Sequence, residues 1–137
     1  MARVVDGFGV FDEVGAPQWF ELHTRAFGEA RQFITETLGV EVAVMSDTDD
    51  FRYATLQGDR GEVGGLFEAT TRLAPDEPNH WKVYIGVPSA DEALTRAVEA
   101  GGQALTEASS SPYGRFATIA DPGGAQLVVM QSAGATP

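Results

Sequence analysis

The chain has 137 residues, enough for one compact domain with its own hydrophobic core. Hydrophobic residues make up 43% of it and charged residues 21%, which is typical of globular rather than disordered proteins. The formal net charge of -11 argues against nucleic acid or an anionic membrane surface as a partner, and the absence of cysteine excludes disulfides and thiolate chemistry.

Nothing in the sequence has the length or the apolar character of a membrane-spanning segment, which needs about 20 residues. The first residues reach Asp6 before a signal-peptide core could form. We therefore expect a cytoplasmic protein that acts on a small molecule or on another protein.

Residues 18–69 predict a first strand–helix–strand series after an N-terminal arm, residues 1–17. Trp19–Thr24 alternates as a strand does, and Ala26–Leu38 has helical spacing with Gly39 as a cap. The apolar residues of this helix are Ala26, Phe27, Ala30, Phe33, Ile34 and Leu38. Three more strands are predicted at Val40–Val44, Phe51–Leu56 and Glu62–Glu68.

Residues 80–131 repeat this plan after a proline-bearing linker, residues 70–79. Lys82–Val87 reads as a strand, Ser89–Glu92 as a capping box that opens a helix, and Gly101-Gly102 as the end of that helix. Residues 132–137 form a tail. The remaining predicted strands are Gln103–Glu107, Arg115–Ala120 and Ala125–Gln131.

The two series align without gaps when the sequence is shifted by 63 residues, which places Trp19–Glu68 over Lys82–Gln131. Nine of the fifty pairs are identical, and Arg52–Leu56 matches Arg115–Ile119 in character at every position. Two copies are too few for a solenoid. The sequence therefore predicts an α+β fold built from two tandem βαβββ modules.

Several segments carry a family resemblance: Trp19–Thr24, Trp81–Val87, Gly101-Gly102, Gly114–Ala117 and Asp121–Ala125. With the duplicated module, they make the chain resemble the vicinal oxygen chelate superfamily, which includes glyoxalase I, bleomycin-resistance proteins and extradiol dioxygenases. Its glyoxalase-like or hydroxylase-like branch is the nearest match. The resemblance implies one domain whose modules form a cupped mixed sheet with helices outside. It also implies a homodimer, with or without module exchange across the linker.

Strand alternation assigns the two faces of the sheet independently of the family. On the first strand Phe20 and Leu22 lie opposite Trp19, Glu21 and His23. The predicted strands Lys82–Val87 and Ala125–Gln131 each have one purely aliphatic side, which suits a face covered by a helix. Its members are Val83, Ile85, Val87, Leu127 and Val129. The residues expected on the other face of these strands and of their repeat partner are Lys82, Tyr84, Gly86, Val128, Met130, Gly65 and Phe67.

Metal-using members of the superfamily hold their ion at positions that correspond here to Trp19, Gly65, Lys82 and Val128. None of these four is a suitable ligand for a divalent metal. We therefore predict no metal and no cofactor. A slip in strand register that brings His80 into the site is the alternative.

The predicted ligand-binding residues lie on this face: Trp19, Phe67, Lys82, Tyr84, Val128 and Met130. Glu21, His23 and Lys82 are the candidate catalytic groups. Each has a structural alternative: Trp19 as a core residue, Glu21 and His23 as a surface pair, Lys82 as a solvated strand residue. For Arg115, its repeat partner Arg52 favours a shared structural role, such as bracing a carboxylate.

Three functions remain open. The first is a metal-free protein that binds a small aromatic or hydrophobic molecule, as the bleomycin-resistance relatives do. The second is an enzyme, either an acid–base catalyst or a glyoxalase-like lyase, isomerase, hydroxylase or dioxygenase acting on a small carbonyl or vicinal-oxygen substrate. The third is a protein-interaction module. The fold alone does not choose among them.

Overall fold

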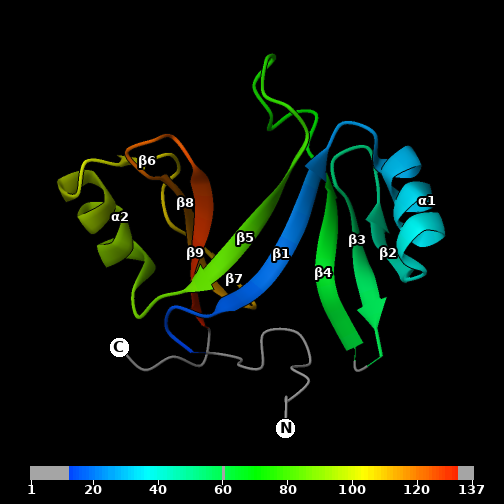
Figure 1. Cartoon of the computed structure of the whole chain (residues 1–137), viewed down its shortest axis with the longest axis horizontal. Helices are drawn as coiled ribbons and strands as arrows, with labels where there is room; N and C mark the ends of the chain where they lie inside the picture. Colours follow the sequence, from blue (N-terminus) through cyan, green and yellow to red (C-terminus); the bar gives the residue numbers. More distant parts are fainter. Residues whose placement is uncertain (1–12, 60, 133–137) are drawn as a thin grey trace, which may run out of the picture. The chain divides into compact units, whose positions relative to one another are not determined.

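The computed structural model describes residues 13–59 and 61–132, which contain nine strands and two helices (Figure 1). The predicted α+β class and its βαβββ arrangement are confirmed. The described residues form two compact units, an N-terminal unit of Trp19–Lys82 and a C-terminal unit of residues 13–18 and 83–132. The elements are β1 (Pro17–Thr24), α1 (Phe27–Leu38), β2 (Glu41–Asp47), β3 (Arg52–Gly58), β4 (Gly61–Glu68), β5 (His80–Gly86), α2 (Ala90–Glu99), β6 (Gln103–Ala104), β7 (Ser109–Ser111), β8 (Gly114–Ala120) and β9 (Gln126–Ser132).

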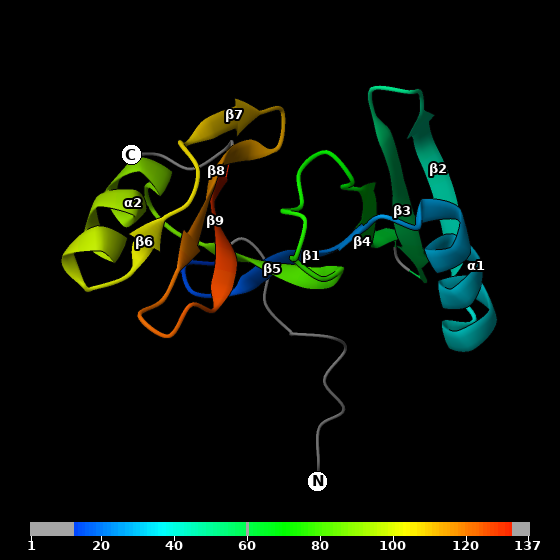
Figure 2. The ribbon, with the colours of Figure 1, turned by 90° about the horizontal axis from the view of Figure 1, so that it is seen from above.

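In the N-terminal unit the strands follow the order β2-β3-β4-β1. Strands β2, β3 and β4 form an antiparallel meander, and β1 joins the edge of β4 in parallel. Helix α1, which connects β1 to β2, lies over one face of this sheet (Figures 1 and 2). The parallel pair places Glu21 opposite Gly65 and His23 opposite Phe67.

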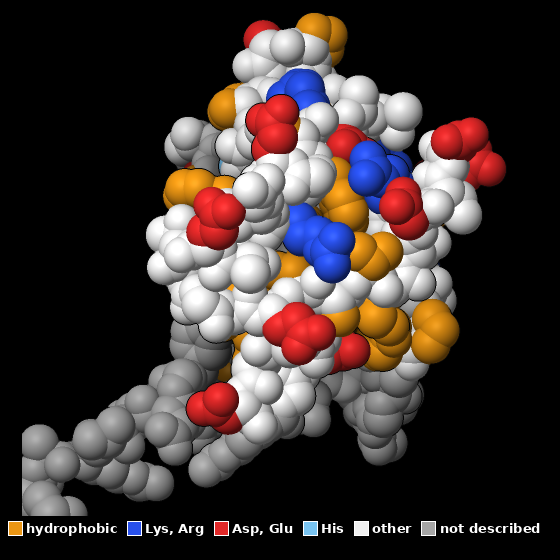
Figure 3. Space-filling view, turned by 90° about the vertical axis from the view of Figure 1, so that its right-hand side faces the viewer, with side chains coloured by type: hydrophobic (Ala, Val, Ile, Leu, Met, Phe, Trp, Pro, Cys, Tyr) orange, Lys and Arg blue, Asp and Glu red, His pale blue; other side chains and the backbone are white. Residues whose placement is uncertain are grey.

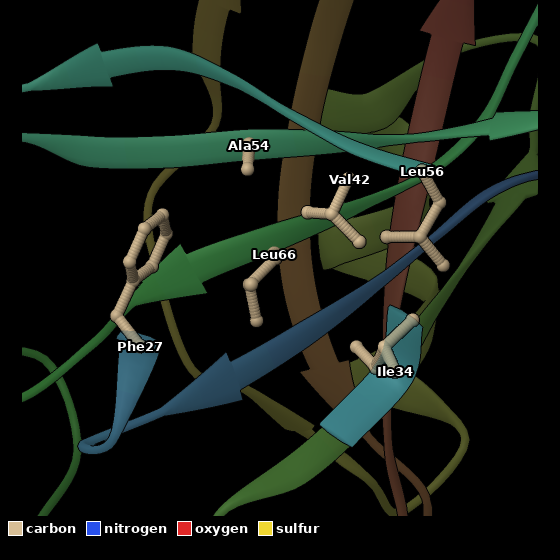
Figure 4. Packing of buried hydrophobic residues seen from close by; sticks show 6 residues of the cluster. All are labelled: Phe27, Ile34, Val42, Ala54, Leu56 and Leu66. Atoms are coloured by element: carbon tan, nitrogen blue, oxygen red, sulfur yellow. The ribbon is translucent and has the colours of Figure 1, made fainter. Parts of the chain in front are cut away.

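The core of this unit lies between α1 and the sheet (Figure 4). Helix α1 contributes Phe27 and Ile34, and the strands contribute Leu66, which is fully buried. Phe20 and Leu22 of β1 pack against the same cluster, as strand alternation predicts. The other members of the buried cluster are Val42, Ala54 and Leu56. Trp19, Glu21 and His23 therefore lie on the face of the sheet that turns away from α1.

Two members of the predicted apolar stripe of α1 do not enter this core. Phe33 is 64% exposed and Leu38 60% exposed. Phe33 lies about 120° around the helix from Phe27, outside the buried stripe, and Leu38 is the last helical residue. The prediction was wrong because it counted every apolar side chain of the helix. On this side of the molecule hydrophobic side chains are mixed with charged ones (Figure 3).

In the C-terminal unit the strands follow the order β5-β9-β8-β6, and the short strand β7 also pairs with β8. Helix α2 packs against this sheet over a core of Ala90, Ala117 and Val129. The first of the two hydrogen bonds of the predicted capping box is present: Ser89 Oγ accepts from the Glu92 amide at 3.2 Å. No helix in the described residues is long and apolar enough to cross a membrane.

The sheet register repeats with the same 63-residue shift as the sequence. Glu21 pairs with Gly65 between β1 and β4, and Tyr84 pairs with Val128 between β5 and β9. The central pairs repeat too: Ala54 with Leu66, and Ala117 with Val129. The two units therefore share strand order, strand direction and the central register. The β6–β8 pair is displaced by one residue, since Gln103 faces Ala120 where Glu41 faces Gln57 in the first unit.

Two local details differ from the sequence prediction. The strand predicted at Gln103–Glu107 is limited to Gln103–Ala104, and Ser109–Ser111, which lies between two predicted strands, forms the short strand β7. The N-terminal arm lies outside the described residues up to residue 12. Next to it, the amide of Gly15 donates to the carbonyl of Gly86 at 2.8 Å, and the Gly86 amide donates to Ala16 at 2.9 Å.

Replacing Leu66 with alanine should remove the centre of the N-terminal core. Leu66 is fully buried, so Leu66→Ala should lower the free energy of unfolding by about 3 kcal/mol. Leu38→Ala is the matched control, because this exposed leucine should change stability by less than about 0.5 kcal/mol. Urea denaturation measures both, and equal effects of the two variants would contradict the described core.

Candidate functional site

Glu21 is the centre of a buried polar network on the face opposite α1. Only 7% of this residue is exposed, and both oxygens of its carboxylate are engaged. Oε1 lies 2.8 Å from His23 Nε2, and Oε2 accepts a hydrogen bond from the Tyr53 hydroxyl at 2.5 Å. Trp19 Nε1 donates in turn to the Tyr53 hydroxyl at 3.1 Å. A carboxylate this deeply buried needs such partners, because its desolvation is otherwise costly.

Tyr53 was not among the predicted site residues. Its position explains why residue 65 is a glycine. A Cβ atom built at Gly65 would lie 2.0 Å from the Tyr53 hydroxyl oxygen and 3.2 Å from Glu21 Oε2. The space above position 65 is therefore filled by the tyrosine hydroxyl. Alternation along β3 carried the signal, since Tyr53 lies on the face opposite Ala54 and Leu56, which belong to the core.

Two rings of this network, His23 and Tyr53, pack with two phenylalanine rings, Phe51 and Phe67. His23 meets Phe67 edge-on with centroids 5.3 Å apart, and Tyr53 lies 6.3 Å from Phe67. Phe51 stacks on Tyr53 at 5.9 Å with an interplanar angle of 6°, and it also lies 5.9 Å from Phe67. Phe51 is 47% exposed, so this aromatic cluster of His23, Phe51, Tyr53 and Phe67 reaches the surface. The Arg72 guanidinium lies 5.6 Å from the Phe67 ring centre.

The network fixes the tautomer of His23. A carboxylate can only accept, so His23 Nε2 carries the hydrogen that points to Glu21 Oε1. In the neutral ring Nδ1 is then left as an acceptor. The surface-pair alternative for Glu21 and His23 is wrong, because their side chains are only 9% and 12% exposed.

The first residues of β5 belong to the N-terminal unit and lie beside β1. His80 stacks on His23 with centroids 5.9 Å apart, while Trp81 packs on Phe20 at 5.8 Å. Lys82 is half-buried. Burial lowers the pKa of Lys82 below the usual lysine value, and the negative charges of Glu77 and Glu21 oppose that shift in part.

The remaining predicted ligand residues belong to the C-terminal unit. Tyr84 pairs with Val128 in the sheet, and Phe116 pairs with Met130. These residues lie on the sheet face opposite Leu127 and Val129, which pack with α2. Val128 itself is 2% exposed. The assignment of Tyr84, Val128 and Met130 to a ligand site stays a prediction.

Both arginines of the repeated Arg-aromatic-Ala-Thr segment bind carboxylates. Arg52 Nε donates to Asp47 Oδ1 at 2.8 Å, at the turn between β2 and β3. Arg115 holds Asp91, in the first turn of α2, with two hydrogen bonds of 2.7 and 3.1 Å. This pairing holds the pKa of the Asp91 carboxyl below its usual range. The shared structural role expected for these arginines matches their contacts.

The donor set of this face does not fit the metal centre that the superfamily implies. Both oxygens of Glu21 are already bonded to protein groups, and the Tyr53 hydroxyl fills the space of any side chain at position 65. Among residues 13–59 and 61–132, no three histidine, aspartate, glutamate or cysteine side chains are grouped to hold an ion. His80 stacks on His23, but Glu21, His23 and His80 do not form such a group. That the protein binds no metal stays a prediction.

Residues 19–130 match the family model described as a glyoxalase-like domain. The chain belongs to the glyoxalase-like family. It is thereby a member of the vicinal oxygen chelate superfamily, and the resemblance carried by its motifs is confirmed.

Curated relatives of the family share about a third of the residues. The chain is 35% identical over 128 residues to "Putative glyoxylase CFP32" of Mycobacterium tuberculosis (strain CDC 1551 / Oshkosh), which covers 93% of this chain and 48% of that protein. It is 34% identical over 133 residues to "Anthracycline biosynthesis protein DnrV" of Streptomyces peucetius, covering 93% of this chain and 46% of that protein. The chain thus spans about half the length of these relatives.

The fold is similar to that of solved structures. A variant of Streptomyces coelicolor methylmalonyl-CoA epimerase in complex with 2-nitronate-propionyl-CoA aligns with a TM-score of 0.59 over 91% of this chain and 100% of that chain. The sequence identity is 17%, so the likeness extends to the fold alone.

Adding a methyl group at position 65 should disturb the Tyr53–Glu21 contact. We expect Gly65→Ala to lower the free energy of unfolding by roughly 1–3 kcal/mol, because its Cβ would overlap the Tyr53 ring and hydroxyl. In a Tyr53→Leu background the same substitution should cost much less. Gly28→Ala in α1 is the control, since no atom lies within 4 Å of its Cβ. Equal costs of Gly65→Ala in both backgrounds would contradict the described packing.

Lys82 should titrate below the ordinary lysine pKa of 10.5. It is the only lysine, so its 13Cε resonance can be followed by NMR without assignment. Glu77→Gln should lower the midpoint further, because it removes a charge that favours the ammonium form. Asp76→Asn serves as the control. Since the folded chain binds this proton less tightly than the unfolded one, stability should rise as the pH rises through the lowered pKa. A midpoint at or above 10.5 would contradict the burial of Lys82.

Proposed function

We propose that the chain binds a small aromatic or hydrophobic molecule against the aromatic cluster of the N-terminal unit. The main observation behind this proposal is the packing of a half-exposed Phe51 on two partly buried rings, Tyr53 and Phe67. His23 in turn packs on Phe67. Exposed aromatic surface backed by fixed polar groups is the usual composition of a small-molecule site.

The polar groups around the cluster complement such a ligand. Glu21 is held by its hydrogen bonds with His23 and with the Tyr53 hydroxyl, so the Glu21–His23 pair does not need to be ordered on binding. Arg72 and Lys82 carry positive charge on the same unit and suit a carbonyl or anionic oxygen of the ligand. The name of the Streptomyces peucetius relative, an anthracycline biosynthesis protein, supports a link to aromatic small molecules.

An enzymatic function is the second candidate, and one contact favours it. The Glu21–His23 pair at 2.8 Å is a carboxylate that orients and polarises an imidazole, an arrangement suited to proton transfer. A glyoxalase-like lyase or isomerase acting on a small carbonyl substrate would use His23 Nδ1 as the base. A metal-dependent hydroxylase or dioxygenase would need a metal centre, and the side chains around Glu21 do not fit one. In the enzymatic case Glu21→Gln would abolish turnover while ligand affinity changed little.

A homodimer and a cytoplasmic location, both expected from the sequence, stay predictions. So does the contribution of Trp19 and of the C-terminal unit to the ligand site. Trp19 supports the Tyr53 hydroxyl through its own hydrogen bond. It therefore has a structural task whether or not it touches ligand.

Phe67→Ala should weaken binding of a flat aromatic probe, 2-methoxynaphthalene, by about tenfold, because it removes the ring that contacts three others of the cluster. Isothermal titration calorimetry measures the affinity. Phe33→Ala, which truncates an exposed phenylalanine of α1, is the matched control and should leave binding unchanged. If the wild type does not bind the probe, or if both variants bind it like the wild type, the proposed site is wrong.

A further inference from the structure

His80 has one ring nitrogen with a partner and one without. Its Nδ1 lies 2.9 Å from the carbonyl oxygen of Pro78. A carbonyl can only accept, so Nδ1 carries the hydrogen and donates it. In the neutral ring Nε2 is therefore a bare acceptor. The tautomer of His80 follows from this single contact.

The Nε2 atom is buried and has no hydrogen-bond partner in the structure. Within residues 13–59 and 61–132 it is the one buried side-chain nitrogen or oxygen in this condition. Buried polar atoms are nearly always paired, and an unpaired one calls for a specific explanation. An acceptor held ready for a donor from outside the chain is such an explanation.

His80 lies on the same face as the aromatic cluster. Its ring stacks on His23, whereas the next residue, Trp81, packs on Phe20, which belongs to the side of the sheet covered by α1. Successive side chains of a strand point to opposite faces, so His80 and Lys82 share the face of His23. His23 in turn contacts Phe67.

We propose that His80 Nε2 accepts a hydrogen bond from a hydroxyl group of the bound aromatic molecule, so that the ligands of this site are phenols. The inference rests on the proposed function. Each oxygen of the buried Glu21 carboxylate already accepts a hydrogen bond from the chain, whereas His80 Nε2 accepts none. Because Nε2 is covered in the ligand-free chain, binding includes a local side-chain movement that opens it to the hydroxyl.

The test compares two probes on the full chain, 2-naphthol and 2-methoxynaphthalene, which share the ring system and the oxygen but carry a hydrogen or a methyl group on that oxygen. We expect 2-naphthol to bind the wild type roughly three- to tenfold more tightly, the range that one net hydrogen bond supplies. His80→Asn keeps a donor for the Pro78 carbonyl but lacks an acceptor at the Nε2 position, so the two probes should bind it equally. His80→Gln reaches that position and should restore part of the preference.

A spectroscopic readout separates this contact from a general loss of structure. The chain has only two histidines, so their ring nitrogens can be followed by 15N NMR. The Nε2 resonance of His80 should shift with 2-naphthol and stay in place with 2-methoxynaphthalene. If both probes bind the wild type equally, or if His80→Asn keeps the preference, the role of His80 is overturned while the proposed function stands. If the wild type does not bind 2-methoxynaphthalene, the proposed function fails and the inference with it.

Discussion

The candidate site depends on one buried carboxylate. Glu21 lies on a strand between hydrophobic neighbours, and its side chain is shielded from water. Burying a carboxylate without partners is costly, so the surrounding residues are constrained to supply them. His23 satisfies one oxygen and the Tyr53 hydroxyl satisfies the other. Much of the geometry of this face follows from that requirement.

The need to pair Glu21 also constrains residues that form no hydrogen bond with it, namely Gly65 and Trp19. Tyr53 can reach the carboxylate only because position 65 has no side chain. Trp19 then holds the hydroxyl from the other side. Phe51 and Phe67 pack on the tyrosine and complete an aromatic surface around a rigid polar centre. Rigidity of this kind favours binding, since little ordering entropy is lost when a ligand arrives.

Much of the fold could be predicted from the sequence because its signals are local and occur twice. The alternation of β1 correctly placed Phe20 and Leu22 toward α1 and Glu21 and His23 away from it. The 63-residue shift predicted two equivalent modules, and the pairing of Glu21 with Gly65 recurs as that of Tyr84 with Val128. Phe33 was misplaced because a helical stripe is narrower than the set of apolar residues on that helix.

Contacts across strands were harder to predict. Tyr53 and Gly65 occupy different strands, and only the paired sheet brings the hydroxyl over the glycine. Position 65 was recognised as lacking a ligand, yet nothing in the sequence says what fills the space. The same holds for His80. Its tautomer depends on the contact with the Pro78 carbonyl, and its Nε2 is unpaired because it is buried; no sequence motif indicates either feature.

The parallel edge strand has a consequence for how the N-terminal unit folds. Strands β2, β3 and β4 are joined by short turns, whereas β1 is separated in sequence from its partner β4 by α1, β2 and β3. Loop-closure entropy therefore favours formation of the meander before β1 docks. Glu21 and His23 arrive with that last strand. We therefore expect Glu21 and His23 to meet Tyr53 and Phe67 late in the folding of this unit, so that partly folded chains present Phe51, Tyr53 and Phe67 without the polar pair beside them.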